Sequence, residues 1–218
     1  MFVVIFEVHP KKDRFDDYLG LAKDLKPELE RIDGFIDNER FESRRQPGHI
    51  LSLSIWRDEK AVIRWRTLEA HHLIQKKGRS DIFDDYHLRV GEITNDSHLP
   101  AGHVIIEQRF DVTVVGSSES VSISEMNGSN DHRKNLNMQI IVGLPAIGSE
   151  GVIDQEIFGG ITHAGKVLLL TSWKDASAAN AWRFSRHDRL DIRHRQVRII
   201  RDYGMHDRRE APQFHHPL

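Results

Sequence analysis

The chain repeats one of its own segments, and this duplication constrains its fold more than any other feature. Residues 34–66 align without a gap with residues 151–183, and about 13 of about 33 positions are identical. GFIDNERF becomes GVIDQEIF, and ILSLSIWRD becomes VLLLTSWKD. Trp56 thereby aligns with Trp173, and Trp65 with Trp182. The spacing far exceeds that of a solenoid repeat, so we predict two like domains in one chain.

Length, charge and composition agree with this prediction and exclude several functions. A chain of 218 residues can hold two domains of about 100 residues each. The formal net charge is −2 with basic residues spread along the chain, so we expect no nucleic-acid partner. Cysteine is absent, which excludes disulfides and cysteine metal sites. The apolar start MFVVIFEV is too short for a signal peptide and no run reaches membrane-spanning length, so we expect a cytoplasmic protein without a membrane segment.

The spacing of apolar residues predicts the element order β-α-β-β-α-β for the first repeat. Strands are expected at 2–8, 35–41, 50–56 and 86–93, and helices at 13–31 and from Asp58 to about 75, where Gly78 ends the second helix. This order is that of the ferredoxin-like split βαβ fold. We therefore predict an α+β protein of two ferredoxin-like (βαββαβ) repeats. The predicted division is repeat one at 1–95, a linker at 96–102, a divergent repeat two at 103–203 and a tail at 204–218 that packs across the surface.

The start of the second repeat allows two alignments. We place its first strand at 103–112, because Phe110 and Val112 then align with Phe6 and Val8. The alternative places this strand at 121–125. The stretch 116–130 is rich in Ser, Gly and Asn and is typical of a loop insertion. The remaining elements are expected as a short helix at 133–141, strands at 151–158 and 167–173, a helix from Asp175, and a strand near 196–201.

Several motifs resemble the antibiotic biosynthesis monooxygenase family. They are GFI-x-x-ERF, LSLS-x-W-x-D-E, W-R-x-x-x-x-H, G-R-x-x-IF-x-DY and RDYGM. The resemblance is good over 1–93, moderate over 151–203 and poor between them. It implies a dimeric α/β barrel, in which two four-stranded sheets pack face to face and each site lies between a sheet and its helices. A tandem chain can form this pair internally, or each chain can form a homodimer, because the bare apolar face of each sheet must be covered.

The resemblance also suggests histidines for the site. The histidine on the second helix of the family corresponds to His71, and to His187 in the second repeat. In an unbroken helix, however, His72 shares the face of Trp65, and His71 lies about 120° away. The catalytic candidates are therefore His71, His72 and His187, since an imidazole generally titrates near neutral pH. The alternative for each is a half-buried helix histidine without a catalytic role.

The other candidates are aromatic and polar residues near the same helix. Trp65, Trp182 and Tyr86 are candidate substrate-binding residues, and the alternative for each is a packed core position. Arg66 either holds an anion or lies on a solvated helix face. Ser52 and Ser54 share one strand face that can line a polar pocket. We expect no metal site, because no H-E-x-x-H or comparable ligand spacing occurs.

Three functions remain open. The first is cofactor-independent monooxygenation of a small aromatic or quinone-type ligand, in which the substrate anion itself reduces oxygen. The second is binding or degradation of haem, which relatives on this fold carry out with an Asn in the first strand, where this chain has Glu7 and no Asn. The third is a non-catalytic module that binds a small ligand or serves a structural role. A bound nucleotide or flavin is not expected, because no glycine-rich phosphate loop is present.

Overall fold

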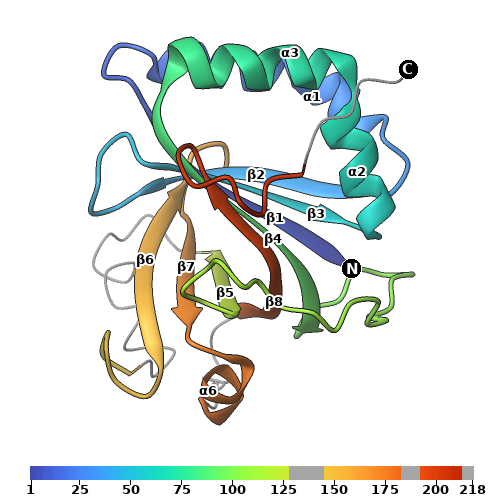
Figure 1. The fold of residues 1–218 in the computed structure, drawn as a ribbon, viewed down its shortest axis with the longest axis vertical. Coiled ribbons are helices and arrows are strands. Elements are labelled where there is room, and N and C mark those ends of the chain that lie inside the picture. Colours follow the sequence, from blue (N-terminus) through green and yellow to red (C-terminus); the bar gives the residue numbers. More distant parts are fainter. Residues whose placement is uncertain (128–144, 183–191, 213–218) are drawn as a thin grey trace.

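The computed structural model describes residues 1–127, 145–182 and 192–212, and its strands close into one barrel (Figure 1). The first repeat contains β1 (Phe2–Pro10), α1 (Phe15–Glu30), β2 (Phe35–Ser43), β3 (Ile50–Trp56), α2 (Glu59–Thr67), α3 (Glu69–Lys77), a π-helix (Gly78–Ile82) and β4 (Phe83–Asp96). The second contains β5 (Ser120–Asn127), β6 (Val152–Gly160), β7 (Lys166–Trp173), α6 (Ala176–Ala181) and β8 (Ile192–Gly204). Helices α1, α2 and α3 cover the first sheet, and α6 lies at the opposite end of the molecule.

The strand order confirms two ferredoxin-like sheets packed as a barrel. The order is β1-β3-β2-β6-β7-β5-β8-β4, with β4 closing onto β1. Each repeat supplies one four-stranded antiparallel sheet, and the antiparallel pairs β2–β6 and β4–β8 join the two. The repeats therefore cover one another within a single chain, as the apolar sheet faces require. The boundaries at residues 95 and 103, and a homodimer of whole chains, stay predictions.

The first strand explains why its sequence is an unbroken apolar run. Val3 and Ile5 point into the barrel and belong to its core cluster, together with residues of both repeats such as Ile123 and Leu170. Val4 and Phe6 point to the opposite face, which lies beneath the helices. Because successive side chains alternate between two buried faces, both must be apolar.

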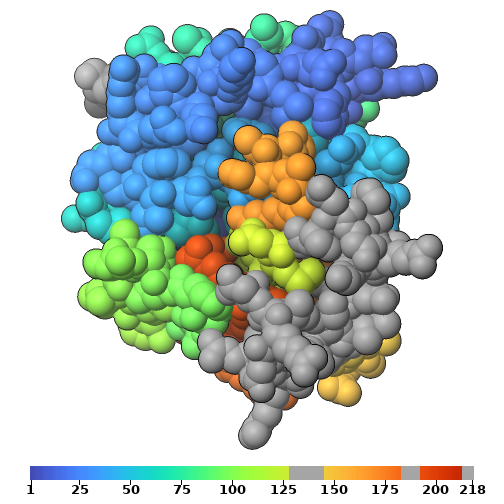
Figure 2. Space-filling view, turned by 180° about the vertical axis from the view of Figure 1, so that it is seen from behind, coloured from blue at the N-terminus to red at the C-terminus, as the bar shows by residue number. Residues whose placement is uncertain are grey.

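The hairpin loop of each repeat reaches over the other repeat. Beyond β6, the Ile161 amide donates to the Arg40 carbonyl at 2.9 Å, and His163 Nδ1 lies 2.8 Å from the Glu39 carboxylate. In return, Arg45 in the β2–β3 loop forms an ion pair with the buried Glu156 of β6 at 2.9 Å. Figure 2 shows the segment of the second repeat, in orange, set against the blue N-terminal half. These contacts lock the two repeats together at the β2–β6 seam.

The preferred alignment of the second repeat was wrong. Residues 103–112 have no regular secondary structure, and β5 begins at Ser120, which pairs with Trp173 as Phe2 pairs with Trp56. Val121 and Ile123 alternate into the barrel core between serines, and this serine-rich pattern resembles a loop. The Val104 and Phe110 side chains are exposed instead. The alternative strand at 121–125 is therefore confirmed, and the helix expected at 133–141 lies outside the described residues.

The same strand-to-helix step occurs in both repeats. Asp58 accepts a hydrogen bond from the Ala61 amide at 2.8 Å, and Asp175 accepts one from the Ala178 amide at the same distance. Gly34 and Gly151 precede the paired strands with φ of +91° and +81°. A Cβ at either position would also lie within 2.7 Å of an alanine methyl in the adjacent helix. Glycine is therefore required at both positions for its backbone conformation and for space.

Candidate active site

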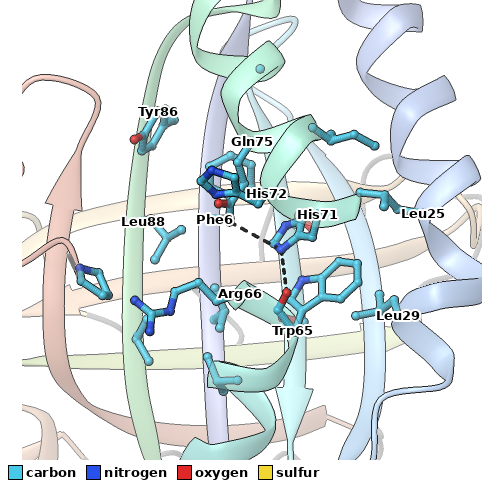
Figure 3. Close-up of a pocket in the computed structure, with 18 of the residues that line it drawn as sticks. Phe6, Leu25, Leu29, Trp65, Arg66, His71, His72, Gln75, Tyr86 and Leu88 are labelled. Carbon is cyan, nitrogen blue, oxygen red and sulfur yellow. Dashed lines mark hydrogen bonds between the residues drawn. The ribbon is translucent and has the colours of Figure 1, made fainter. Parts of the chain in front are cut away.

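One cavity lies between the first sheet and its helices, with a volume of about 740 Å³. Strand residues form its floor, α1 forms one wall through Leu25 and Leu29, and α2 and α3 form its roof (Figure 3). Members of two apolar clusters line it, one cluster containing Val62 and the other Phe83. The predicted position of the site, between a sheet and its helices, thus coincides with this cavity.

Two rows of side chains cross the floor, and both begin in the first repeat and end on β8 of the second. By strand register, the first row is Arg40, Ser52, Phe6, Leu88 and Tyr203. The second row is Asn38, Ser54, Val4, Val90 and Arg201. Each row is apolar in its middle and polar at its ends. Since neighbouring strands lie about 4.8 Å apart, each row spans roughly 19 Å.

The second predicted helix is broken at Leu68, which contradicts the expectation of one helix to about residue 75. Leu68 is extended, with φ of −61° and ψ of 128°, and it ends α2 and begins α3. At the break, the Thr67 hydroxyl donates to the Ile63 carbonyl at 2.9 Å, which competes with continued backbone pairing. Gly78 is the C-cap of the second segment, as predicted, and it is also the first residue of the π-helix that follows.

The break brings His71 and Trp65 together, which an unbroken helix would prevent. Their rings stack with centroids 4.1 Å apart and an interplanar angle of 17°. His71 Nδ1 lies 3.0 Å from the Trp65 carbonyl oxygen, and this oxygen can only accept, so Nδ1 carries the proton. In this tautomer Nε2 keeps a lone pair, and no described residue donates a hydrogen bond to it.

Burial determines the charge of this histidine. It lowers the pKa of His71 to about 4, and the hydrogen bond to the Trp65 carbonyl opposes the shift only in part. His71 is therefore neutral at pH 7. A neutral imidazole stacked on an indole gives the roof of the cavity a hydrogen-bond acceptor beside an aromatic surface.

The structure brings together four of the six predicted site residues. Trp65, His71, His72 and Tyr86 all line the cavity (Figure 3). Trp182 does not line it, because its ring packs beside Trp173 at 5.7 Å in the apolar cluster under α6. His187 lies outside the described residues.

Further predictions concerned strand residues. Ser52 and Ser54 do line the cavity, as their shared strand face predicted. Trp56 and Trp173, which align in the two repeats, are fully buried. Their indole N–H groups donate to Ser54 at 2.9 Å and to Ser122 at 2.8 Å.

Sequence reasoning missed the contribution of the C-terminal residues. Arg201 and Tyr203 on β8, and Arg208, Ala211 and Pro212 after it, line the cavity of the first repeat. Arg208 donates a hydrogen bond to the Tyr86 hydroxyl, and Glu210 accepts one from the Asp202 amide at 2.6 Å. The tail thus packs on the surface as predicted, up to residue 212. The motif RDYGM was visible in the sequence, but nothing local indicated that it faces the other repeat.

Fold and cavity together define the class: a tandem α/β barrel with a small-molecule cavity beneath the helices of its first repeat. The model of the family described as "Antibiotic biosynthesis monooxygenase" matches residues 1–77. A relative named jasmonate monooxygenase ABM, from Pyricularia oryzae, is 39% identical over 100% of this chain and 99% of its own length. The chain therefore belongs to the antibiotic biosynthesis monooxygenase family, and monooxygenase activity is the function this membership supports.

One solved structure agrees at the level of the fold, and a second is a weaker match. An aldoxime dehydratase in complex with butyraldoxime matches 91% of this chain and 79% of its own, with a TM-score of 0.57 and 10% identity. An antibiotic biosynthesis monooxygenase matches 41% of this chain and 95% of its own, with a TM-score of 0.38 and 19% identity. At these identities the first likeness concerns the fold alone.

Within the described residues, no helix combines the length and the apolar character that crossing a membrane requires. The same residues include no cluster of three or more His, Asp or Glu side chains arranged to hold a metal ion.

Proposed function

We propose that the chain is a monooxygenase that inserts one oxygen atom into a small, largely apolar molecule of the jasmonate class. The relative that covers the whole chain is named for this substrate, which supports the choice. The small aromatic or quinone-type substrates suggested by the family resemblance stay a second prediction. The same assay tests both classes.

The cavity beside Trp65 and His71 is the observation that carries this proposal. Its volume of about 740 Å³ falls within the usual range of small-ligand sites, which is about 300–1,000 Å³. Phe6, Leu25, Leu88 and Trp65 offer an apolar and aromatic surface, and polar groups line other parts of the cavity. Such a site binds an apolar body by burial and orients it by a small number of hydrogen bonds.

The proposed reaction joins R–H, O₂, two electrons and two protons to give R–OH and water. For jasmonate, a reduced nicotinamide nucleotide in solution supplies the two electrons. Trp65 and the sheet floor hold the substrate body and exclude water. His71 Nε2 can accept a hydrogen bond from a substrate hydroxyl, which a dihydroxynaphthalene carries and the jasmonate anion lacks, and it thereby orients the hydroxyl-bearing substrates. Because its pKa is about 4, His71 passes on any proton that it receives at neutral pH.

We further propose that the chain acts without a tightly bound cofactor, since its sequence contains no glycine-rich phosphate loop. Haem handling stays an alternative prediction. Titration of the purified protein with haem, followed at the Soret band, tests this alternative directly, because a flat titration removes it.

The test is turnover of jasmonic acid by the purified full chain under isotope-labelled oxygen, with NADPH present. We expect a product that carries one labelled oxygen atom, and the same assay is run with a dihydroxynaphthalene. His71→Asn preserves a donor for the Trp65 carbonyl and removes the Nε2 lone pair. We expect this variant to lower kcat for the dihydroxynaphthalene by about tenfold to a hundredfold, a typical effect of losing one such group.

The matched control is Leu73→Ala, because Leu73 lies on α3 with 61% exposure and does not line the cavity. This variant should turn over at the rate of the unmodified chain. Absence of labelled product from every substrate would reject the proposed activity. Full activity of His71→Asn would reject the role of His71 alone.

A further inference from the structure

Three arginines from separate parts of the chain converge on one end of the cavity. Arg66 comes from α2, Arg201 from β8, and Arg208 from the C-terminal segment, and all three line the cavity. Each acts electrostatically on the hydroxyl of Tyr203, which also lines the cavity. The Arg208 guanidinium sits 5.7 Å from the centre of the Tyr203 ring. In Figure 3, Arg66 extends from α2 toward β4 and away from Trp65 and His71.

None of these three cations pairs directly with a carboxylate among the described residues, although Arg201 acts electrostatically on the exposed Asp111. None of them forms a salt bridge there, whereas Arg57 and Arg109 each pair with two carboxylates. Glu59, the acidic residue that lines the cavity, is held by Arg109 at 2.7 Å. The described salt bridges therefore leave the three arginines at this end of the cavity without a directly paired carboxylate. Arg66 and Arg201 are partly buried and Arg208 is exposed. Guanidinium groups in this situation favour a bound anion, which they can hold with paired, charge-assisted hydrogen bonds.

Two further arginines line the cavity at other places, and the register separates Arg40 from this cluster. Arg40 stands at the opposite end of the floor row that ends at Tyr203, roughly 19 Å away by strand spacing. Phe6 and Leu88 form the middle of that row. A ligand bound by the Tyr203 cluster therefore extends its apolar body over Phe6 and Leu88, toward Trp65 and His71.

We propose that Arg66, Arg201, Arg208 and the Tyr203 hydroxyl form a carboxylate subsite, so that the preferred substrates are monocarboxylates with an apolar body and not their esters. Planar guanidinium groups match the two oxygens of a carboxylate. Burial raises the pKa of Tyr203 to about 12, so its hydroxyl keeps its proton and can donate to the anion. Two of these arginines and the tyrosine belong to the second repeat or its tail, which makes that repeat a specificity element for the cavity of the first.

The choice of ligand rests on the proposed function, so binding is measured separately from turnover. The probes are jasmonic acid and its methyl ester, titrated into the full chain by calorimetry without an electron donor. We expect the acid to bind at least about tenfold more tightly than the ester, because hydrogen bonds to charged groups are stronger than neutral ones. Arg201→Gln and Arg66→Gln should weaken acid binding by about tenfold to a hundredfold and change ester binding little.

Two variants guard against indirect effects. Arg208→Gln alters an exposed side chain outside the regular elements and should reduce the preference for the acid without altering thermal stability. Arg64→Gln is the matched control, since Arg64 lies on the same helix as Arg66, does not line the cavity and pairs with Asp33 instead. This control should preserve the preference for the acid.

The outcomes separate the two proposals. Equal binding of acid and ester by the unmodified chain, or unchanged acid binding in all three variants, overturns the carboxylate subsite whether or not jasmonate is oxygenated. Tight and selective binding of the acid without labelled product upholds the subsite and rejects the proposed oxygenation.

Discussion

At the scale of single residues, His71 shows how local geometry determines chemistry. Its Nδ1–H donates a hydrogen bond to the Trp65 carbonyl, and its ring is stacked on the Trp65 indole. Burial lowers the pKa of His71 to about 4. The imidazole is thus held in one tautomer and one charge state. This arrangement depends on the extended conformation of Leu68. No glycine or proline at this position indicates the helix break in the sequence.

The shifted pKa of His71 predicts a pH dependence of stability. The unfolded chain binds a proton at this residue below about pH 6.5, and the folded chain only below about pH 4. Acidification between these values therefore favours unfolding, at a cost on the order of 2 kcal/mol after allowance for partial exposure. His71→Asn should make the fall of unfolding free energy between pH 6.5 and 4.5 shallower. Urea denaturation at several pH values measures this.

The control for this measurement is His206→Asn, because His206 is exposed in the C-terminal segment. It should reproduce the slope of the unmodified chain. If His71→Asn and the unmodified chain lose stability in parallel on acidification, the shifted pKa assigned to His71 is wrong.

The site residues divide into those that a sequence can indicate and those that it cannot. Trp65, His71 and Tyr86 stand close together in the sequence and within motifs, so their shared location could be predicted. Arg201 and Tyr203 reach the cavity only because β8 pairs with β4 across the two repeats. A contact between distant strands leaves no local pattern.

At the scale of elements, the duplicated helix start allows a matched comparison. Asp58 and Asp175 cap α2 and α6 with the same bond length, yet only α2 carries cavity residues. Substitution of the two caps can therefore distinguish an effect on stability, which both should show, from an effect on ligand binding, which only the α2 cap should show.

We expect Asp58→Ala and Asp175→Ala each to lower the unfolding free energy by about 1 kcal/mol, the usual value of such a cap. Asp58→Ala should also weaken jasmonic acid binding severalfold, because the first turn of α2 positions Trp65 and Arg66. Asp175→Ala should leave binding unchanged. Denaturation and calorimetry of both variants provide the test, and equal effects on binding would argue against a link between the α2 cap and the cavity.

Element prediction succeeded where apolar periodicity was strong and failed where composition misled. β3 is found at 50–56 as predicted, because Leu51, Leu53 and Ile55 alternate with serines. β5 has the same alternation but follows a run of Ser and Gly, and an equally apolar segment at 103–112 competed with it. That segment is held by Glu92, whose carboxylate accepts from the Gln108 amide at 2.6 Å, and this contact is invisible in the sequence.

At the scale of the whole molecule, the duplication extends to charges inside the barrel. Glu7 pairs with Arg89 at 2.5 Å, and Glu125 pairs with Arg195 at the equivalent places of the second repeat. Burial opposes the ionisation of Glu7, but Arg89 and neighbouring histidines outweigh it and lower the pKa of Glu7 to about 2. The two pairs are therefore ionised at neutral pH.

Removal of one member of the Glu7–Arg89 pair should lower the unfolding free energy more than removal of both members. We expect Arg89→Met to destabilise the chain by about 3 kcal/mol, because the buried Glu7 carboxylate loses its main partner. The double variant Glu7→Gln/Arg89→Met should recover more than half of this loss, because no charge then stays unpaired. Chemical denaturation at pH 7 compares the two. A double variant that is less stable than Arg89→Met would show that the pair contributes net stability.

The covalent union of the two repeats has a consequence for how the molecule can diversify. Two identical subunits must change every pocket at once, since one gene encodes both sides of the contact. Here β8, which borders the cavity, and the helices that form its roof are encoded by separate stretches of one gene. In the folded chain they are brought together because β8 pairs with β4. Selection can therefore retune ligand preference through the C-terminal half while the N-terminal half keeps its chemistry.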